Sequence, residues 1–296
     1  RMFRFIDPGS LRMLAVRSDM TPQVGRIAAT GLVGAQRPLR LSYSGQVVTI
    51  KSDALDPRRE RIQVGAELIG SDSVAAAAEI VTLAVETLKA AGATGISVDF
   101  TLPDLVDTLA EKALPLGPGQ IEAVRRELDA KDAGGLKEAG GEAYLPLLYA
   151  MGPFESAIET LAQIDAGGVL ASRIAGLKEI AARVNGAARL TLDPSERHGF
   201  EYQSWFGFTI YADGVRGALG RGGTYRILGV DDQLIDAANE NAMPRDTVFL
   251  PLGHDPALGA RLRADGWRTI AALSESDDGA TLGCTHVLDG GAPRKL

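Results

Sequence analysis

The chain has 296 residues, of which 45% are hydrophobic and 23% are charged, and these values are typical of a globular protein. A formal net charge of −7 and a pI near 5.1 argue against broad, sequence-independent binding to nucleic acid, which needs clustered Lys and Arg. Cys284 is the single cysteine, no apolar run reaches the ~18 residues of a membrane span, and no signal-peptide pattern is present, so we expect a cytoplasmic protein without disulfides.

Residues 1–70 are rich in strand and turn patterns. A turn is expected at Asp7-Pro8-Gly9. The segment "TPQVGRIAAT" predicts a helix with Thr21 as N-cap and Pro22 in the first helical position. A strand is expected in "LRLSYSGQVVTI", residues 39–50, and a polar loop follows it.

The next segment, "RIQVGAELIG" at residues 61–70, alternates as a strand does. One row offers Gln63 and Glu67 on either side of a bare Gly65, and this gap predicts a floor on which a small ligand could lie. Glutamate and glutamine oxygens suit an ammonium group. The alternative is a solvated strand face whose glycine marks a bulge. The other row is expected to pack on a core: Ile62, Val64, Ala66 and Leu68.

Residues 71–91 predict a helix with Ser71 or Asp72 as its cap and Gly92 as its end. The strand "GISVDF" follows, and then residues 102–188 read as a helical insertion of short helices separated by Gly and Pro clusters. The helix of residues 71–91 is expected to bury one face: Val74, Ala78, Val81, Val85 and Leu88.

Strand patterns return in "ARLTLDP" and "GFEYQSWFGFTIYAD", where Phe206 and Trp205 are expected on opposite faces. From Arg245 the tail reads as a small βαβ unit. We therefore predict an α+β fold, with a core domain at residues 1–244, including the insertion, and a small α/β domain at residues 245–296.

Motifs for metal, nucleotide or nucleophilic chemistry are absent from the sequence. The histidines His198, His254 and His286 have no partner at metal-ligand spacing. Neither GxxxxGK[ST], GxSxG nor GxGxxG occurs. We expect no catalytic residue, no metal and no cofactor.

Four segments in order resemble the catalytic core of histidyl-tRNA synthetase. They are "LAVRSDMTPQVGRIA", "YSGQVVTI…RRERIQVGAELIG", "RHGFEYQSWFGFTIY" and "GRGGTY". In detail they are more similar to the family's non-catalytic paralogues, the regulatory subunits of ATP phosphoribosyltransferase. The resemblance covers roughly residues 1–226 and implies a class II aminoacyl-tRNA synthetase-like antiparallel sheet with a helical insertion.

The resemblance also implies a histidine site. Gln63 and Glu67 match residues that hold the α-amino group of histidine. Asp19 and Thr21 match an acidic and threonine pair of the "RPEGT" type. Aromatic positions near the imidazole are matched by Tyr202 and Tyr225.

Departures from the synthetase pattern lie at the positions that handle ATP. Thr49 stands where the synthetases carry an arginine that grips the α-phosphate, and His198 stands where they carry a second arginine. Arg197 lies one position before His198. Gln203 stands where the synthetases carry a second tyrosine. No GxGxGxR motif follows Tyr225. Activation of histidine by ATP is therefore not expected.

The resemblance implies a regulatory subunit that binds histidine as effector and assembles with the short catalytic subunit of ATP phosphoribosyltransferase. That enzyme joins ATP to phosphoribosyl pyrophosphate in the first step of histidine synthesis. A homodimer within a hetero-octamer is expected, with no nucleic-acid or membrane partner. Two alternatives stay open, a histidine–tRNA ligase and a stand-alone amino-acid-binding protein. Against the ligase, the tail offers only Phe249 and Trp267 as large aromatic side chains for stacking on bases.

Overall fold

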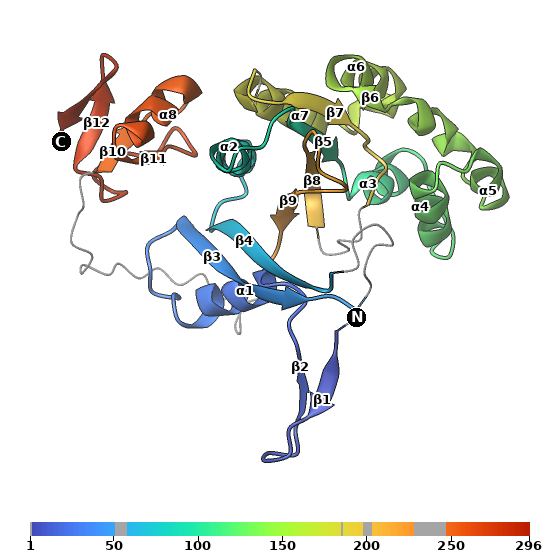
Figure 1. The fold of residues 1–296 in the computed structure, drawn as a ribbon. Coiled ribbons are helices and arrows are strands. Elements are labelled where there is room, and N and C mark those ends of the chain that lie inside the picture. Colours follow the sequence, from blue (N-terminus) through green and yellow to red (C-terminus); the bar gives the residue numbers. More distant parts are fainter. Residues whose placement is uncertain (1, 51–57, 185, 198–202, 228–246) are drawn as a thin grey trace. The chain divides into compact units, whose positions relative to one another are not determined.

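The computed structural model describes residues 2–50, 58–184, 186–197, 203–227 and 247–296. The chain divides into two compact units, residues 1–71 with 227–296, and residues 72–226. Helices and strands occur in both units (Figure 1), which confirms the α+β class. None of the helices in the described part of the chain combines the length and apolar composition that crossing a bilayer requires.

The first unit begins with a hairpin of β1 (Arg4–Ile6) and β2 (Met13–Ala15). Its connection is stabilised by Asp7, whose carboxylate accepts a hydrogen bond of 3.0 Å from the Ser10 N–H, so the predicted turn is confirmed. Large apolar side chains of this hairpin are exposed in the chain by itself: Phe5, Ile6, Leu11, Met13 and Leu14.

Helix α1 (Thr21–Thr30) starts at the predicted place, with Pro22 in its first turn, but Thr21 is not its cap. The N-cap position is Met20, which makes no side-chain capping bond. The Asp19 carboxylate accepts the Thr21 N–H at 3.1 Å instead. Thr21 is already helical, so its hydroxyl is left to contact another element.

Strands β3 (Leu39–Val48) and β4 (Glu60–Ile69) form an antiparallel pair in which Tyr43 lies opposite Gly65. Both strands lie where they were predicted, but the row of β4 side chains that faces inward is not the predicted one. Ile62 and Val64 are 73% and 67% exposed, whereas Glu67 is only 9% exposed. The polar row is the covered one because α1 packs on that side of β4, where Thr21 meets Tyr43.

The C-terminal part of this unit confirms the predicted βαβ tail. β10 (Thr247–Leu250) leads into α8 (Pro256–Ala264) and returns in the parallel strand β11 (Arg268–Ala271). β12 (His286–Asp289) pairs in parallel on the other side of β10, and an unpredicted β13 (Ala292–Lys295) adds an antiparallel edge. Val248, Leu250 and Leu262 form its small core.

The second unit is built on a five-stranded sheet of order β6-β7-β5-β8-β9. β8 pairs antiparallel with β5 and with β9, as expected for a synthetase-like sheet, whereas β5 and β7 are parallel. The strands are β5 (Ser97–Thr101), β6 (Gly152–Pro153), β7 (Arg189–Leu192), β8 (Gln203–Tyr211) and β9 (Gly220–Tyr225).

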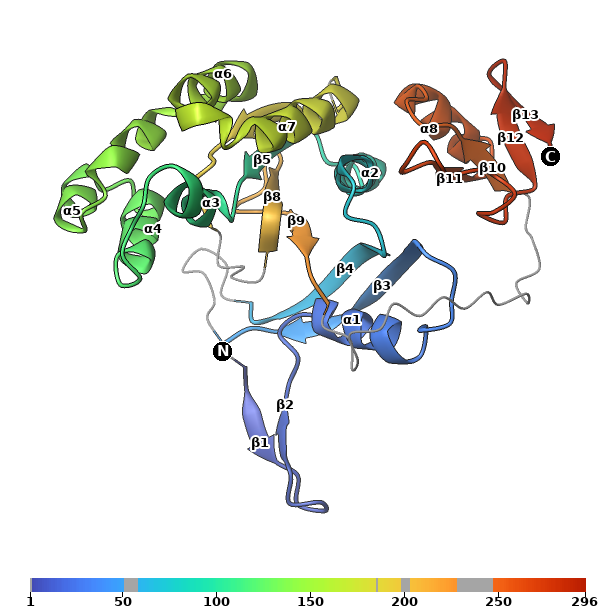
Figure 2. The same ribbon diagram turned by 180° about the vertical axis from the view of Figure 1, so that it is seen from behind.

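Helix α2 (Val74–Ala90) is capped by Ser73, whose hydroxyl accepts the Ala76 N–H at 3.2 Å, and not by Ser71 or Asp72. Its predicted face is buried at Ala78, Val81 and Val85. The insertion is helical as predicted (Figure 2). It contains α3 (Leu105–Lys112), α4 (Ile121–Asp129), α5 (Ala133–Glu138), the 3₁₀ helix η1 (Glu142–Tyr149), α6 (Phe154–Ile164), the 3₁₀ turn η2 (Ala166–Gly168) and α7 (Ala171–Val184).

One hydrophobic core joins the sheet of this unit to the insertion. Phe100 of β5 meets Phe154 of α6 edge-on at 5.7 Å between ring centroids, and Phe206 of β8 at 5.5 Å. Trp205 packs against the same core as Phe206, so the prediction that they face opposite ways is wrong. The register shifts between Gln203 and Gly207, and such a bulge breaks simple alternation.

A charged cluster also ties the insertion to the loop after β7. The Lys131 ammonium donates at 2.8 Å to both the Asp193 carboxylate and the Ser195 hydroxyl. Burial raises the pKa of the neighbouring Glu196 carboxyl to about 7, and the negative charges of Asp193 and Asp99 add to this increase. Deprotonating Glu196 therefore costs more in the folded chain than in the unfolded one.

This raised pKa predicts a specific pH dependence of stability. Protonated Glu196 contributes its full stabilisation of the folded chain below the ordinary glutamate pKa of 4.5. This stabilisation is lost as the pH rises towards about 7. Wild type and Glu196→Gln should melt alike at the acidic end, and the variant should become the more stable one as the pH increases. Thermal melts across this range check it, and a difference that does not change with pH would contradict the assignment.

Candidate functional site

Asp19 and Gln63 lock the loop before α1 onto β4. The Gln63 amide donates from Nε2 to Asp19 Oδ1 at 2.8 Å, and its Oε1 accepts the Met20 N–H at 2.8 Å. The same Asp19 oxygen accepts the Thr21 N–H. Gln63 therefore positions the Asp19 carboxylate as well as lying on the polar face of the strand.

Tyr43 fills the gap that Gly65 leaves in this polar face. A Cβ atom on Gly65 would lie 2.2 Å from Tyr43 Cζ, so no other residue could occupy position 65 without displacing the ring. The Tyr43 hydroxyl lies 3.2 Å from Thr21 Oγ1 and 3.4 Å from Glu67 Oε1. A ligand here would meet a tyrosine ring at Gly65 in place of the bare backbone expected from the sequence.

The electrostatics of this face favour a cation. Asp19 and Glu67 place two carboxylates near the Tyr43 hydroxyl. Burial raises the pKa of Tyr43 to about 12, the Thr21 hydrogen bond opposes this, and the charges of Glu67 and Asp19 add to it. The hydroxyl is consequently protonated at neutral pH and can donate or accept a hydrogen bond.

Four of the six predicted histidine-site residues, Asp19, Thr21, Gln63 and Glu67, come together in the first unit. Tyr225 ends β9 in the second unit, where its backbone pairs with Gln203. Tyr202 lies outside the described residues. Tyr43 was not predicted as a site residue, although an aromatic residue facing a strand glycine is a usable signal once the register is known.

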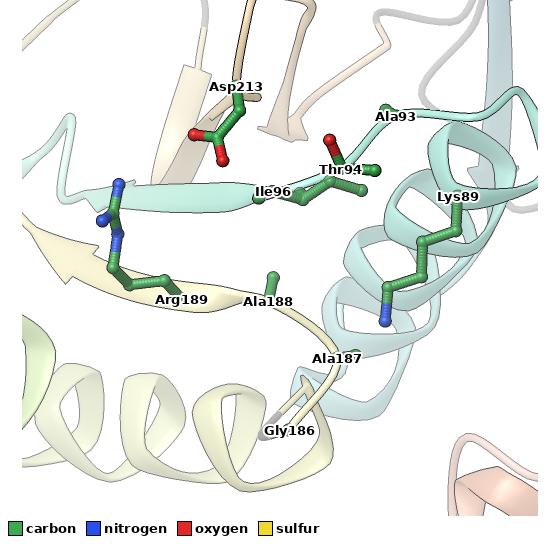
Figure 3. Close-up of a pocket in the computed structure, with 10 residues that line it drawn as sticks. Lys89, Ala93, Thr94, Ile96, Gly186, Ala187, Ala188, Arg189 and Asp213 are labelled. Atoms are coloured by element: carbon green, nitrogen blue, oxygen red, sulfur yellow. The ribbon is translucent and has the colours of Figure 1, made fainter.

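A separate pocket of about 650 Å³ lies in the second unit, at the C-terminal ends of α2 and α7. Figure 3 shows Lys89 and Arg189 on opposite sides of it, with Asp213 reaching over β5. The Asp213 N–H donates to the Thr94 carbonyl at 3.0 Å, and this backbone bond joins the segment after β8 to the segment before β5. The two cations do not converge, and none of the predicted site residues lines this pocket.

Within residues 2–50, 58–184, 186–197, 203–227 and 247–296, no three His, Cys, Asp or Glu side chains are grouped to hold a metal ion. The arrangement on β4 is suited to binding a cationic group.

Comparisons with known proteins agree with the resemblance. Residues 1–238 match the family model described as histidyl-tRNA synthetase. A Rhodospirillum centenum protein named ATP phosphoribosyltransferase regulatory subunit is 42% identical, covering 99% of this chain and 81% of the relative. A protein of the same name from Paramagnetospirillum magneticum is 38% identical, covering 97% of this chain and 80% of the relative.

Solved structures share the fold. One from Bacillus halodurans, described as an ATP phosphoribosyltransferase regulatory subunit/histidyl-tRNA synthetase, has a TM-score of 0.65 at 19% identity, covering 97% of this chain and 82% of that one. A chain of the Thermotoga maritima ATP phosphoribosyl transferase (HisG:HisZ) complex has a TM-score of 0.61 at 15% identity, covering 77% and 81%.

The fold and the family model together define a histidyl-tRNA synthetase-like protein with the class II synthetase architecture. Within this class, the chain belongs to the family of ATP phosphoribosyltransferase regulatory subunits.

The close approach of Tyr43 to Gly65 can be tested by stability. Gly65→Ala should lower the free energy of unfolding by about 1–3 kcal/mol, because the added methyl group overpacks the ring. Gly220→Ala on β9 is the matched control, since a Cβ there has nothing within 4 Å. Denaturant unfolding of both variants gives the comparison, and an equally small change in both would show that the ring does not cover Gly65.

Proposed function

We propose that this chain binds histidine on the polar face of β4 and regulates a catalytic ATP phosphoribosyltransferase subunit through that binding. The observation that carries the proposal is the pair of carboxylates, Asp19 and Glu67, held beside hydroxyl groups on a covered strand face. An α-ammonium group brings three N–H donors and a positive charge to such acceptors. Tyr202 and Tyr225 are proposed to lie on the imidazole side.

We further propose that the chain performs no catalysis of its own. Thr49 follows β3, where its N–H donates to the Arg59 carbonyl at 2.9 Å. A short neutral hydroxyl cannot grip a phosphate as a forked guanidinium does, and losing such a group typically costs several kcal/mol of transition-state stabilisation. Arg197 lies 3.5 Å from Glu122, and His198 is outside the described residues.

The proposed partner is the short-form catalytic subunit of ATP phosphoribosyltransferase, and the name shared by the relatives supports it. The proposed assembly is a hetero-octamer with a dimeric regulator. Histidine inhibits if it binds more tightly to the inactive arrangement, with a coupling free energy of typically ~1–3 kcal/mol. We also propose residues 1–244 as the synthetase-like core and residues 245–296 as a small α/β domain.

Glu67→Gln tests the ligand site. The amide keeps the shape and loses the charge, so histidine affinity should fall about tenfold or more while the melting temperature changes little. Glu60→Gln, at the exposed start of the same strand, is the control and should bind as wild type does. Calorimetric titration measures both, and equal affinity of wild type and Glu67→Gln would remove Glu67 from the site.

Two assays test the regulatory role. Mixing the chain with a short-form ATP phosphoribosyltransferase should raise the turnover of that enzyme and make it sensitive to histidine. Histidine-dependent ATP–pyrophosphate exchange should be absent from the purified chain. Clear exchange would favour a histidine–tRNA ligase, and histidine binding without any effect on the enzyme would favour a stand-alone binding protein.

A further inference from the structure

A second glycine opens the polar face of the β3–β4 pair beside Gln63. Gly45 of β3 lies directly opposite Gln63 of β4, and residues paired in this way share a face of the sheet. A Cβ atom on Gly45 would lie 2.9 Å from Arg17 Nη2 and 2.7 Å from Met20 Sδ. The tip of the Arg17 side chain therefore lies over this glycine, on the face that carries the proposed site.

Arg17 is anchored on β3 by two contacts that leave its terminal nitrogens free to donate. Its carbonyl accepts the Val48 N–H at 3.0 Å, and its Nε donates to the Gln46 carbonyl at 2.7 Å. A guanidinium has five N–H donors, and Nε supplies one of them. Among the residues that the structure describes, no carboxylate forms an ion pair with Arg17, and its side chain is exposed. Nη1 and Nη2 can therefore donate to a ligand.

Arg17 and Asp19 belong to one short segment that is fixed to both strands. At the end of this segment the Met20 N–H donates to Gln63 Oε1 at 2.8 Å, and the Gln63 amide donates to the Asp19 carboxylate at 2.8 Å. The segment thus brings a cation and an anion, two residues apart in the chain, to the same strand pair. Glu67 adds a second carboxylate to this face. An α-amino acid carries an ammonium and a carboxylate on one carbon atom, so both kinds of charge suit it.

We propose that Arg17 binds the α-carboxylate of the amino acid, so that the site holds its ligand by both charged ends. This inference rests on the proposed histidine binding. A planar guanidinium and a carboxylate can form two parallel N–H···O bonds, which fix orientation as well as adding binding energy. Arg61, a rival cation in the same row of β4, lies two residues beyond Gln63 on the side away from Glu67.

The test compares two ligands on wild type and Arg17→Gln. Histamine keeps the imidazole and the ammonium group of histidine and lacks the carboxylate. Both ligands are titrated calorimetrically into each protein. Arg17→Gln should lose about tenfold in histidine affinity, the scale of a hydrogen bond between charged groups, and should change by less than about twofold in histamine affinity. Wild type should therefore prefer histidine to histamine, and the variant should lose most of this preference.

Three further variants sharpen the comparison. Arg17→Lys retains the charge and loses the fork, so its histidine affinity should lie between those of wild type and Arg17→Gln. Arg61→Gln removes the rival cation, and Arg12→Gln removes an exposed arginine between β1 and β2, and both should leave the preference for histidine unchanged. Melting temperatures show which variants are folded. If Arg17→Gln does not fold, Arg17→Lys carries the comparison with a smaller expected loss.

The outcomes separate this inference from the proposed function. Histidine binding by wild type with the same affinity in Arg17→Gln would overturn the role of Arg17 alone, as would equal affinities of wild type for the two ligands. Equal losses for histidine and histamine would also overturn it, because they would assign the arginine a structural role over Gly45. A larger histidine-specific loss in Arg61→Gln would place the carboxylate at Arg61 instead. Failure of wild type to bind histidine would overturn the proposed function, and this inference with it.

Discussion

The packing of the Tyr43 ring on Gly65 is the contact on which the polar face of β4 depends. It places an aromatic ring where the strand has no side chain, and it brings a hydroxyl to Glu67, a carboxylate that is only 9% exposed. The glycine is therefore needed for the room it leaves, and the tyrosine for the group it brings into that room.

The same face is coupled to the start of α1. Asp19 accepts the Thr21 N–H at the first turn of the helix, and Gln63 holds Asp19 from β4. The Thr21 hydroxyl, which does not cap the helix, contacts Tyr43 instead. Because these groups share partners, substitutions among them should not have additive effects.

The proposed separation of histidine binding, in this chain, from catalysis, in a partner, follows from the charged residues that the site contains. Asp19 and Glu67 both place negative charge near the Tyr43 hydroxyl, and we propose that this charge serves the ammonium end of an amino acid. Thr49 provides no positive charge for a phosphate. Binding an amino acid needs only the carboxylates, whereas activating it with ATP needs the carboxylates and a cation for the phosphate. A site of this composition is suited to sensing, with the chemistry left to a partner.

The long helix α2, the strands β3 and β4, the helical insertion and the βαβ tail could all be predicted from the sequence, because apolar periodicity and turn residues are local signals. The sequence also brought Asp19, Thr21, Gln63 and Glu67 into one hypothesis through the resemblance. The row of β4 that faces inward could not be predicted in this way, because it depends on how α1 packs against the strand. A period of two separates the rows without stating where α1 docks, and here Ile62 and Val64 are outside. Tyr43 and the β8 bulge that turns Trp205 inward were likewise decided by strand register, which joins residues distant in sequence.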